Sequence, residues 1–201
     1  MTHRRRVLLM VPLVLVIVLL HGCVKVLEPL SNPGKAEPDK GLVGKWKMTS
    51  ASGNLSRLTL DKGYEIGRPA VEDNPKGLMR AMYDGQADDP TFWFFTTKIG
   101  KDTYATLFID ADFSKAGAFE KWNEKDERRY HVFRYVLDGD KLTIDGGDDE
   151  AMEKLMQDDS IPRRYGFFDI PEAWLAKYLE KNGPKTLYNR KNVQEWRRLK
   201  K

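Results

Sequence analysis

The sequence predicts a mainly β protein with some α-helix: a small antiparallel meander sheet or barrel with two helices near the C-terminus. Short stretches of alternating apolar and polar residues recur between turn signals, and they outnumber the helical patterns. Asp138-Gly139 between two such stretches is the strongest hairpin signal in the chain. With 201 residues, the chain is long enough for one domain with its own core.

The predicted strands begin near residue 42 and follow one another through short turns. Residues 42–48 alternate through Trp46 and Met48, as a strand with one buried face does. Residues 68–90 are rich in proline and predict a long loop with one helical turn at 77–82. Further strands are expected at 55–60, 64–66, 91–97, 103–109, 129–137 and 141–145.

The helical patterns lie in the second half of the chain. A short helix is expected near 118–122, and acidic residues at 148–150 favour the start of another that runs through Met156. Pro171 suits the first turn of the last helix, which Gly183 ends. A strand is expected at 165–169. Residues 193–200 fit a strand or a helix, and we favour a strand because it would cover a free edge of the meander.

Residues 1–22 are predicted to be a signal peptide. Three arginines precede an apolar run at 7–20, which is shorter than the roughly 20 residues that a spanning helix needs. Leu20-His21-Gly22-Cys23 then resembles the lipobox of bacterial lipoproteins. The resemblance implies cleavage between Gly22 and Cys23, a diacylglyceryl group on the Cys23 sulfur and an acyl chain such as palmitate on the new N-terminus. The alternatives are an ordinary cleaved signal and a signal-anchor.

The resemblance also implies a place in the cell. The expected location is a membrane of the cell envelope, facing the periplasm where there are two membranes, and Val24 in place of aspartate favours the outer one. Residues 23–40 contain three prolines and are expected to form a flexible tether, with an ordered arm as the alternative. The folded domain is expected over 41–201. A single cysteine allows no intrachain disulfide, so packing must stabilise it.

Gly44-Lys45-Trp46 in the first predicted strand is similar to the Gly-x-Trp signature of lipocalin-like (calycin) barrels. In that family a basic residue of the last strand packs over the tryptophan, and Arg197 or Arg198 holds the corresponding place. The long 68–90 loop and the two late helices depart from the family pattern. Without the arginine contact, Trp46 would be an ordinary core tryptophan.

No catalytic, cofactor or metal site is predicted, and an enzyme is not expected. His131 is the one histidine after the signal, and no nucleophile motif accompanies it. The acidic cluster at 145–150 matches no calcium loop and is interpreted as a capped helix start. The three signal-peptide arginines account for most of the formal charge of +4, so no nucleic-acid partner is expected.

The expected function is a membrane-anchored binding module for a small lipophilic ligand. Such a barrel should hold a cavity of more than about 300 Å³. The alternative is an accessory lipoprotein that docks an envelope protein, with a filled barrel and a broad exposed apolar patch. Six aromatic residues either line the cavity or form a plain core: Phe92, Phe94, Tyr104, Phe108, Phe133 and Tyr135.

Overall fold

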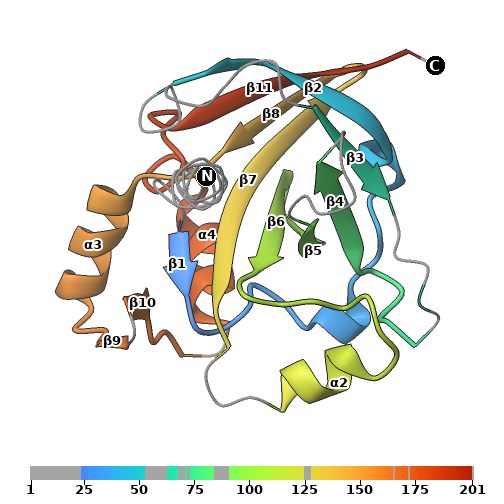
Figure 1. Cartoon of the computed structure of the whole chain (residues 1–201). Helices are drawn as coiled ribbons and strands as arrows, with labels where there is room; N and C mark the ends of the chain where they lie inside the picture. Colours follow the sequence, from blue (N-terminus) through green and yellow to red (C-terminus); the bar gives the residue numbers. More distant parts are fainter. Residues whose placement is uncertain are drawn as a thin grey trace, which may run out of the picture.

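Eight antiparallel strands form a closed barrel in the computed structural model (Figure 1). The structure describes residues 24–52, 63–67, 71, 73–83, 91–124, 128–164, 166–171 and 173–200. Each barrel strand pairs with its neighbour in the chain, and β11 pairs with β2 to close the ring. The barrel strands are β2 (Gly44–Ala51), β3 (Gly63–Gly67), β4 (Met79–Tyr83), β5 (Thr91–Ile99), β6 (Asp102–Phe108), β7 (Tyr130–Asp138), β8 (Lys141–Asp145) and β11 (Val193–Arg198).

This architecture confirms the predicted fold class. The Asp138–Lys141 hairpin joins β7 to β8 as expected, and residues 193–198 form a strand, not a helix. The barrel strands near 42–48, 64–66, 91–97, 103–109, 129–137 and 141–145 are confirmed within a few residues at their ends. The expected strand at 55–60 lies outside the described residues.

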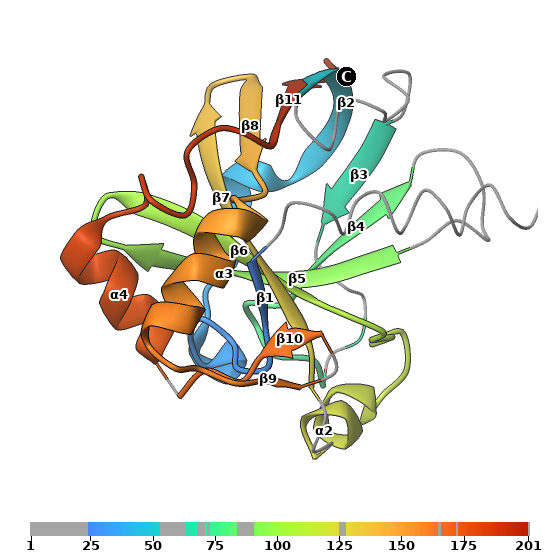
Figure 2. The same cartoon turned by 90° about the vertical axis from the view of Figure 1, so that its left-hand side faces the viewer.

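Two apolar clusters lie on opposite sides of the barrel wall because side chains alternate along each strand. Trp46, Met48 and Trp196 belong to the cluster inside the barrel. Trp93, Tyr104 and further outward side chains of β5, β6 and β7 belong to a larger cluster outside it. The outer cluster also takes in buried residues of α2 (Ala118–Asn123), α3 (Asp149–Asp158) and α4 (Trp174–Asn182). Figure 2 shows α3 and α4 packed side by side over one flank.

Local signals set the helix ends. Asp148 is the N-cap of α3, and its carboxylate accepts hydrogen bonds from the backbone N–H groups of Glu150 and Ala151. The two late helices are thereby confirmed. The second begins at Trp174, later than Pro171, because Pro171 forms a turn in which the N–H of Trp174 bonds its carbonyl. No helix within the described ranges is long and apolar enough to span a bilayer.

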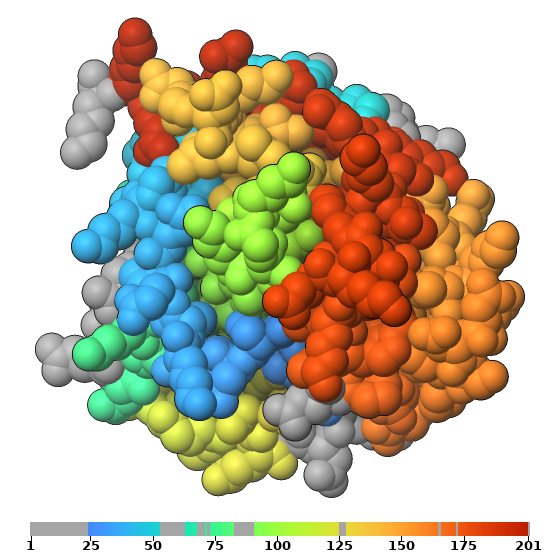
Figure 3. Space-filling view, turned by 180° about the vertical axis from the view of Figure 1, so that it is seen from behind, coloured from blue at the N-terminus to red at the C-terminus, as the bar shows by residue number. Residues whose placement is uncertain are grey.

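The flexible tether expected at 23–40 is wrong for residues 24–40. Val24 and Val26 lie in β1 (Val24–Val26), which pairs antiparallel with residues 130–132 of β7, and both are fully buried. β8 pairs with β7 only from residue 134 on, so β1 satisfies the part of the β7 edge that β8 does not reach. The arm continues through η1 (Pro33–Lys35) and η2 (Lys40–Leu42) across the outside of the barrel (Figure 3).

The helical turn expected at 77–82 is also wrong. Residues 79–83 form β4, which pairs with β3 and β5. Leu, Met, Arg and Ala favour helices in isolation, but the hydrogen bonds of two neighbouring strands outweigh that local preference. The strand expected at 165–169 is reduced to a two-residue strand, β10 (Phe167–Phe168), paired with β9 (Arg163–Arg164).

Candidate functional site

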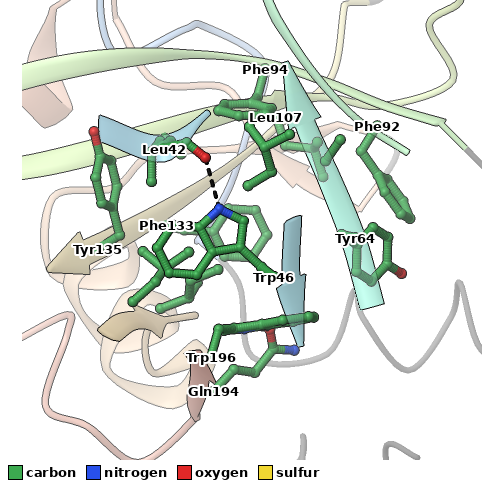
Figure 4. Close-up of a pocket in the computed structure, with 15 residues that line it drawn as sticks. Leu42, Trp46, Tyr64, Phe92, Phe94, Leu107, Phe133, Tyr135, Gln194 and Trp196 are labelled. Carbon is green, nitrogen blue, oxygen red and sulfur yellow. Dashed lines mark hydrogen bonds between the residues drawn. The ribbon is translucent and has the colours of Figure 1, made fainter. Parts of the chain in front are cut away.

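The barrel interior holds a half-open cavity of about 160 Å³. Fifteen of the described residues line it, contributed by all eight barrel strands and by η2 (Figure 4). Seven of them are aromatic: Trp46, Tyr64, Phe92, Phe94, Phe133, Tyr135 and Trp196. The volume is about half of the 300 Å³ expected for a lipophilic-ligand barrel. The site therefore suits a small molecule, or a short part of a larger one.

Four of the six aromatic residues singled out in the sequence line this cavity: Phe92, Phe94, Phe133 and Tyr135. The expectation is wrong for Tyr104 and Phe108, which pack in the outer cluster. Strand β6 turns its small and aliphatic residues, Ala105 and Leu107, inward instead. The aromatic side of β6 faces outward because the helices and the N-terminal arm cover it, so both faces of this strand are apolar and aromatic content does not tell them apart.

Several polar atoms of the lining are bound to protein partners. Trp46 Nε1 donates to the carbonyl of Leu42 at 2.8 Å, and the Tyr135 hydroxyl donates to Asp39 Oδ2 at 2.7 Å. Burial and then the Asp39 carboxylate raise the pKa of Tyr135, so this phenol stays neutral. Gln194 is the one lining residue with a polar, non-aromatic side chain, and its Oε1 accepts a hydrogen bond from Trp196 Nε1 at 3.2 Å. The cavity therefore favours a ligand with an apolar surface.

One end of the barrel is closed by Leu42 of η2 and by the start of β2. Arg198 lies over Trp46, with its Cζ 4.2 Å from the ring centroid, and its guanidinium donates to the carbonyls of Val43 and Gly41. Of the two candidate arginines, Arg198 makes this contact and Arg197 is exposed. A cation over a tryptophan face contributes of the order of 1 kcal/mol.

Gly44 is shaped for this contact. Its φ is +139°, and a Cβ added there would lie 2.7 Å from Arg198 Nη1. A side chain at this position would therefore collide with the guanidinium and strain the backbone. The three residues of the expected signature, Gly44, Trp46 and Arg198, form one packed unit at the closed end.

The acidic cluster is part of a structural hydrogen-bond network. Asp145 is buried and accepts the N–H groups of Gly147 and Arg190. Burial raises its pKa, and those two bonds oppose the rise. Burial disfavours ionisation of Asp148 too, but its hydrogen bonds from Asn189 and from the α3 N-terminus lower its pKa overall. Within the described part of the chain, no group of three His, Cys, Asp or Glu side chains could hold a metal.

Exposed apolar surface is scattered. Among the described residues, three large apolar side chains are exposed: Val43, Val136 and Leu199. Isolated apolar side chains of this kind are normal on a protein surface. A second hollow, of about 360 Å³, lies outside the barrel between Arg80, Trp93 and Asp112, and polar and apolar groups line it in similar measure.

The remaining site predictions concern the start of the chain. Gly22, Cys23 and the signal segment lie outside the described residues. Comparisons with protein-family models, with curated proteins and with solved structures find no significant match to this chain.

Proposed function

We propose that this protein is a lipid-anchored protein of the cell envelope whose barrel binds a small apolar molecule. The observation that carries the proposal is the cavity: fifteen lining residues from every barrel strand, of which Gln194 alone is polar and non-aromatic. Pockets with an apolar lining and few polar groups are the usual sites for small ligands. The unit formed by Gly44, Trp46 and Arg198 supports a lipocalin-like barrel.

The cavity volume bounds the ligand. An engineered apolar cavity of about 150 Å³ in another protein stays dry and binds benzene. The present cavity of about 160 Å³ is of that size. The ligand is therefore a molecule with a compact apolar part, such as a small aromatic compound or the end of an acyl chain. Gln194 offers one amide for a polar atom at the edge of that part.

Benzene is the probe for this site. Saturating benzene is expected to raise the midpoint of thermal unfolding of the wild-type protein, because a ligand that binds only the folded state stabilises it. Ala105→Leu fills the cavity, so it should abolish this shift and itself raise the free energy of unfolding by about 1 kcal/mol. Differential scanning calorimetry measures both effects.

Thr143→Leu is the matched control, since Thr143 lies on β8 between the cavity residues Leu142 and Ile144 and points outward. This variant should keep the benzene response. An unchanged midpoint in the wild type, or the same shift in Ala105→Leu, would refute the binding proposal. Native mass spectrometry of protein extracted from membranes then identifies the natural ligand.

The anchor is tested separately at Cys23. Cys23→Ser is expected to move the protein from the carbonate-washed membrane fraction to the soluble fraction, because two or three acyl chains hold a protein firmly and none remain in this variant. Gly22→Ala keeps a small residue before the cleavage site and should stay in the membrane. Retention of Cys23→Ser in the membrane, measured by immunoblotting of fractions, would rule out the thioether anchor.

A further inference from the structure

The chain is fixed to the barrel from residue 24 on. Val24 is fully buried, is paired with Val132 of β7, and packs so closely on Gly147 that a Cβ there would lie 3.1 Å from Val24 Cγ2. Leu27 and Leu30 are buried as well. No stretch between residue 24 and the barrel is long enough to serve as a spacer.

This has a consequence for the proposed anchor, on which the following inference rests. The acylated residue would be Cys23, and consecutive Cα atoms are about 3.8 Å apart. The acyl chains would therefore leave the protein at the start of β1, directly beside the folded body. We propose that the protein sits against the bilayer through one specific surface, the sheet face beside β1.

That face is the side of β1, β7, β10 and β9 turned away from the outer apolar cluster. Lys25 lies between the buried Val24 and Val26, and its register partner His131 lies between the buried Tyr130 and Val132, so both point to the opposite side. We call this surface the basic face, and it consists of Lys25, Arg129, Arg164 and Phe167, with the buried His131 beneath them.

Ring and register contacts place its other members together. The Phe167 ring lies 5.6 Å from the His131 ring, and Arg129 Cζ lies 5.8 Å from the Phe167 centroid. Arg164 is the register partner of Phe167. Figure 1 shows β1, β10 and β9 along the same flank of the molecule, at the end of the barrel wall away from β2.

Charge and chemistry of the basic face suit a phospholipid surface. Each Lys or Arg close to an anionic leaflet adds attraction to it, and this attraction falls away within a Debye length. Two acids accompany the cations: Asp169 pairs with Arg164 at 2.6 Å, and Asp110 lies 4.0 Å from Arg129. Lys25 has no ion pair within the described residues, which leaves its charge for lipid phosphates.

The basic face also shares a side of β7 with the cavity. Phe133 lines the cavity, and His131, two residues earlier, lies on the same face of the strand. A protein seated on the basic face would therefore turn the cavity side of β7 toward the membrane. An apolar ligand drawn from the bilayer would then have a short path to the barrel.

The test measures which surface touches lipid. Full-length lipidated protein carrying a fluorophore at Arg164→Cys is reconstituted in phosphatidylethanolamine–phosphatidylglycerol vesicles that contain a nitroxide-headgroup lipid. We expect the fluorophore to be quenched several-fold more than one at Lys47→Cys, an exposed position on β2 at the opposite side of the barrel. Circular dichroism confirms that both variants fold.

Equal quenching at the two positions, or stronger quenching at Lys47→Cys, would overturn the proposal that the basic face lies against the bilayer. Lys25→Glu in the Arg164→Cys background should reduce the quenching, whereas Lys45→Glu should not; the reverse order would also overturn it. A failed anchor gives a different result, because the protein would then be absent from the membrane fraction before any labelling.

Discussion

Gly44→Ala is expected to lower the free energy of unfolding by about 2–4 kcal/mol. Part of the loss is backbone strain, since the φ of +139° at Gly44 is a conformation that L-residues rarely adopt. The rest comes from Arg198, whose Nη1 would lie 2.7 Å from the new methyl group. The guanidinium must then move away from the carbonyls of Gly41 and Val43. Urea unfolding followed by tryptophan fluorescence measures the change.

Gly67→Ala is the matched control. Gly67 lies in the neighbouring strand β3, has no positive φ, and within the described part of the chain no atom lies within 4 Å of an added Cβ, so its replacement should change stability by less than about 1 kcal/mol. In an Arg198→Met background, Gly44→Ala should cost only the backbone part of its effect. Equal losses in both backgrounds would show that Arg198 does not depend on Gly44.

The barrel was predictable because its signals are local. Alternation marks one buried face, and Asp138-Gly139 marks a tight turn between β7 and β8. The Gly44-x-Trp46 signature and its arginine could be found for the same reason: each is a short motif at a strand end. The choice between Arg197 and Arg198 follows from strand parity, which places alternate residues on opposite faces.

The misses share one physical cause, which is that long-range partners decided the structure. Met79–Tyr83 is helical by local preference but lies between two strands that need a partner. Val24–Val26 lies in a proline-rich context, yet it covers the free edge of β7. The aromatic content of β6 predicts that Tyr104 and Phe108 lie inside the barrel, but a second core lies outside it and holds both residues.

Some residues that line the cavity could not be predicted from the sequence, for a similar reason. Trp196 and Leu107 line the cavity, but nothing in their own segments distinguishes them from packed core residues. The volume of the cavity depends on how side chains from eight strands and from η2 fit together. No local pattern encodes how these side chains fit together. The sequence can therefore suggest a hollow barrel but not the volume of its cavity.

Acid is expected to destabilise the protein through His131. This histidine is 1% exposed, and its Nδ1 has no hydrogen-bond partner among the described residues. Burial, reinforced by the charge of Lys25, lowers the pKa of His131 from 6.5 to about 3. Below pH 6.5, His131 is therefore protonated in the unfolded chain but stays neutral in the folded protein. Above pH 6.5 the free energy of unfolding is not reduced by His131. From there toward pH 3 it should fall by about 1.4 kcal/mol per pH unit.

Between pH 7 and pH 5 the loss should reach about 2 kcal/mol, measured by urea unfolding at each pH. The carboxyl groups with lowered pKa values, such as Asp112 and Glu195, lose their contributions only at lower pH, where carboxyls titrate. Asp145, whose pKa burial raises, would act with the opposite sign, so the part of the pH 5–7 slope that belongs to His131 is the difference between the wild type and His131→Leu.

His131→Leu should remove this slope, because leucine cannot be protonated. It should also raise stability at pH 7 by about 1 kcal/mol, since an unpaired buried nitrogen is replaced by apolar surface. Lys25→Met should keep the slope but begin to level off at higher pH, because the pKa of folded His131 rises when the neighbouring positive charge is gone. A wild-type protein equally stable at pH 7 and pH 5 would mean that His131 accepts a proton in the folded state, and that the basic face is open to water at this residue.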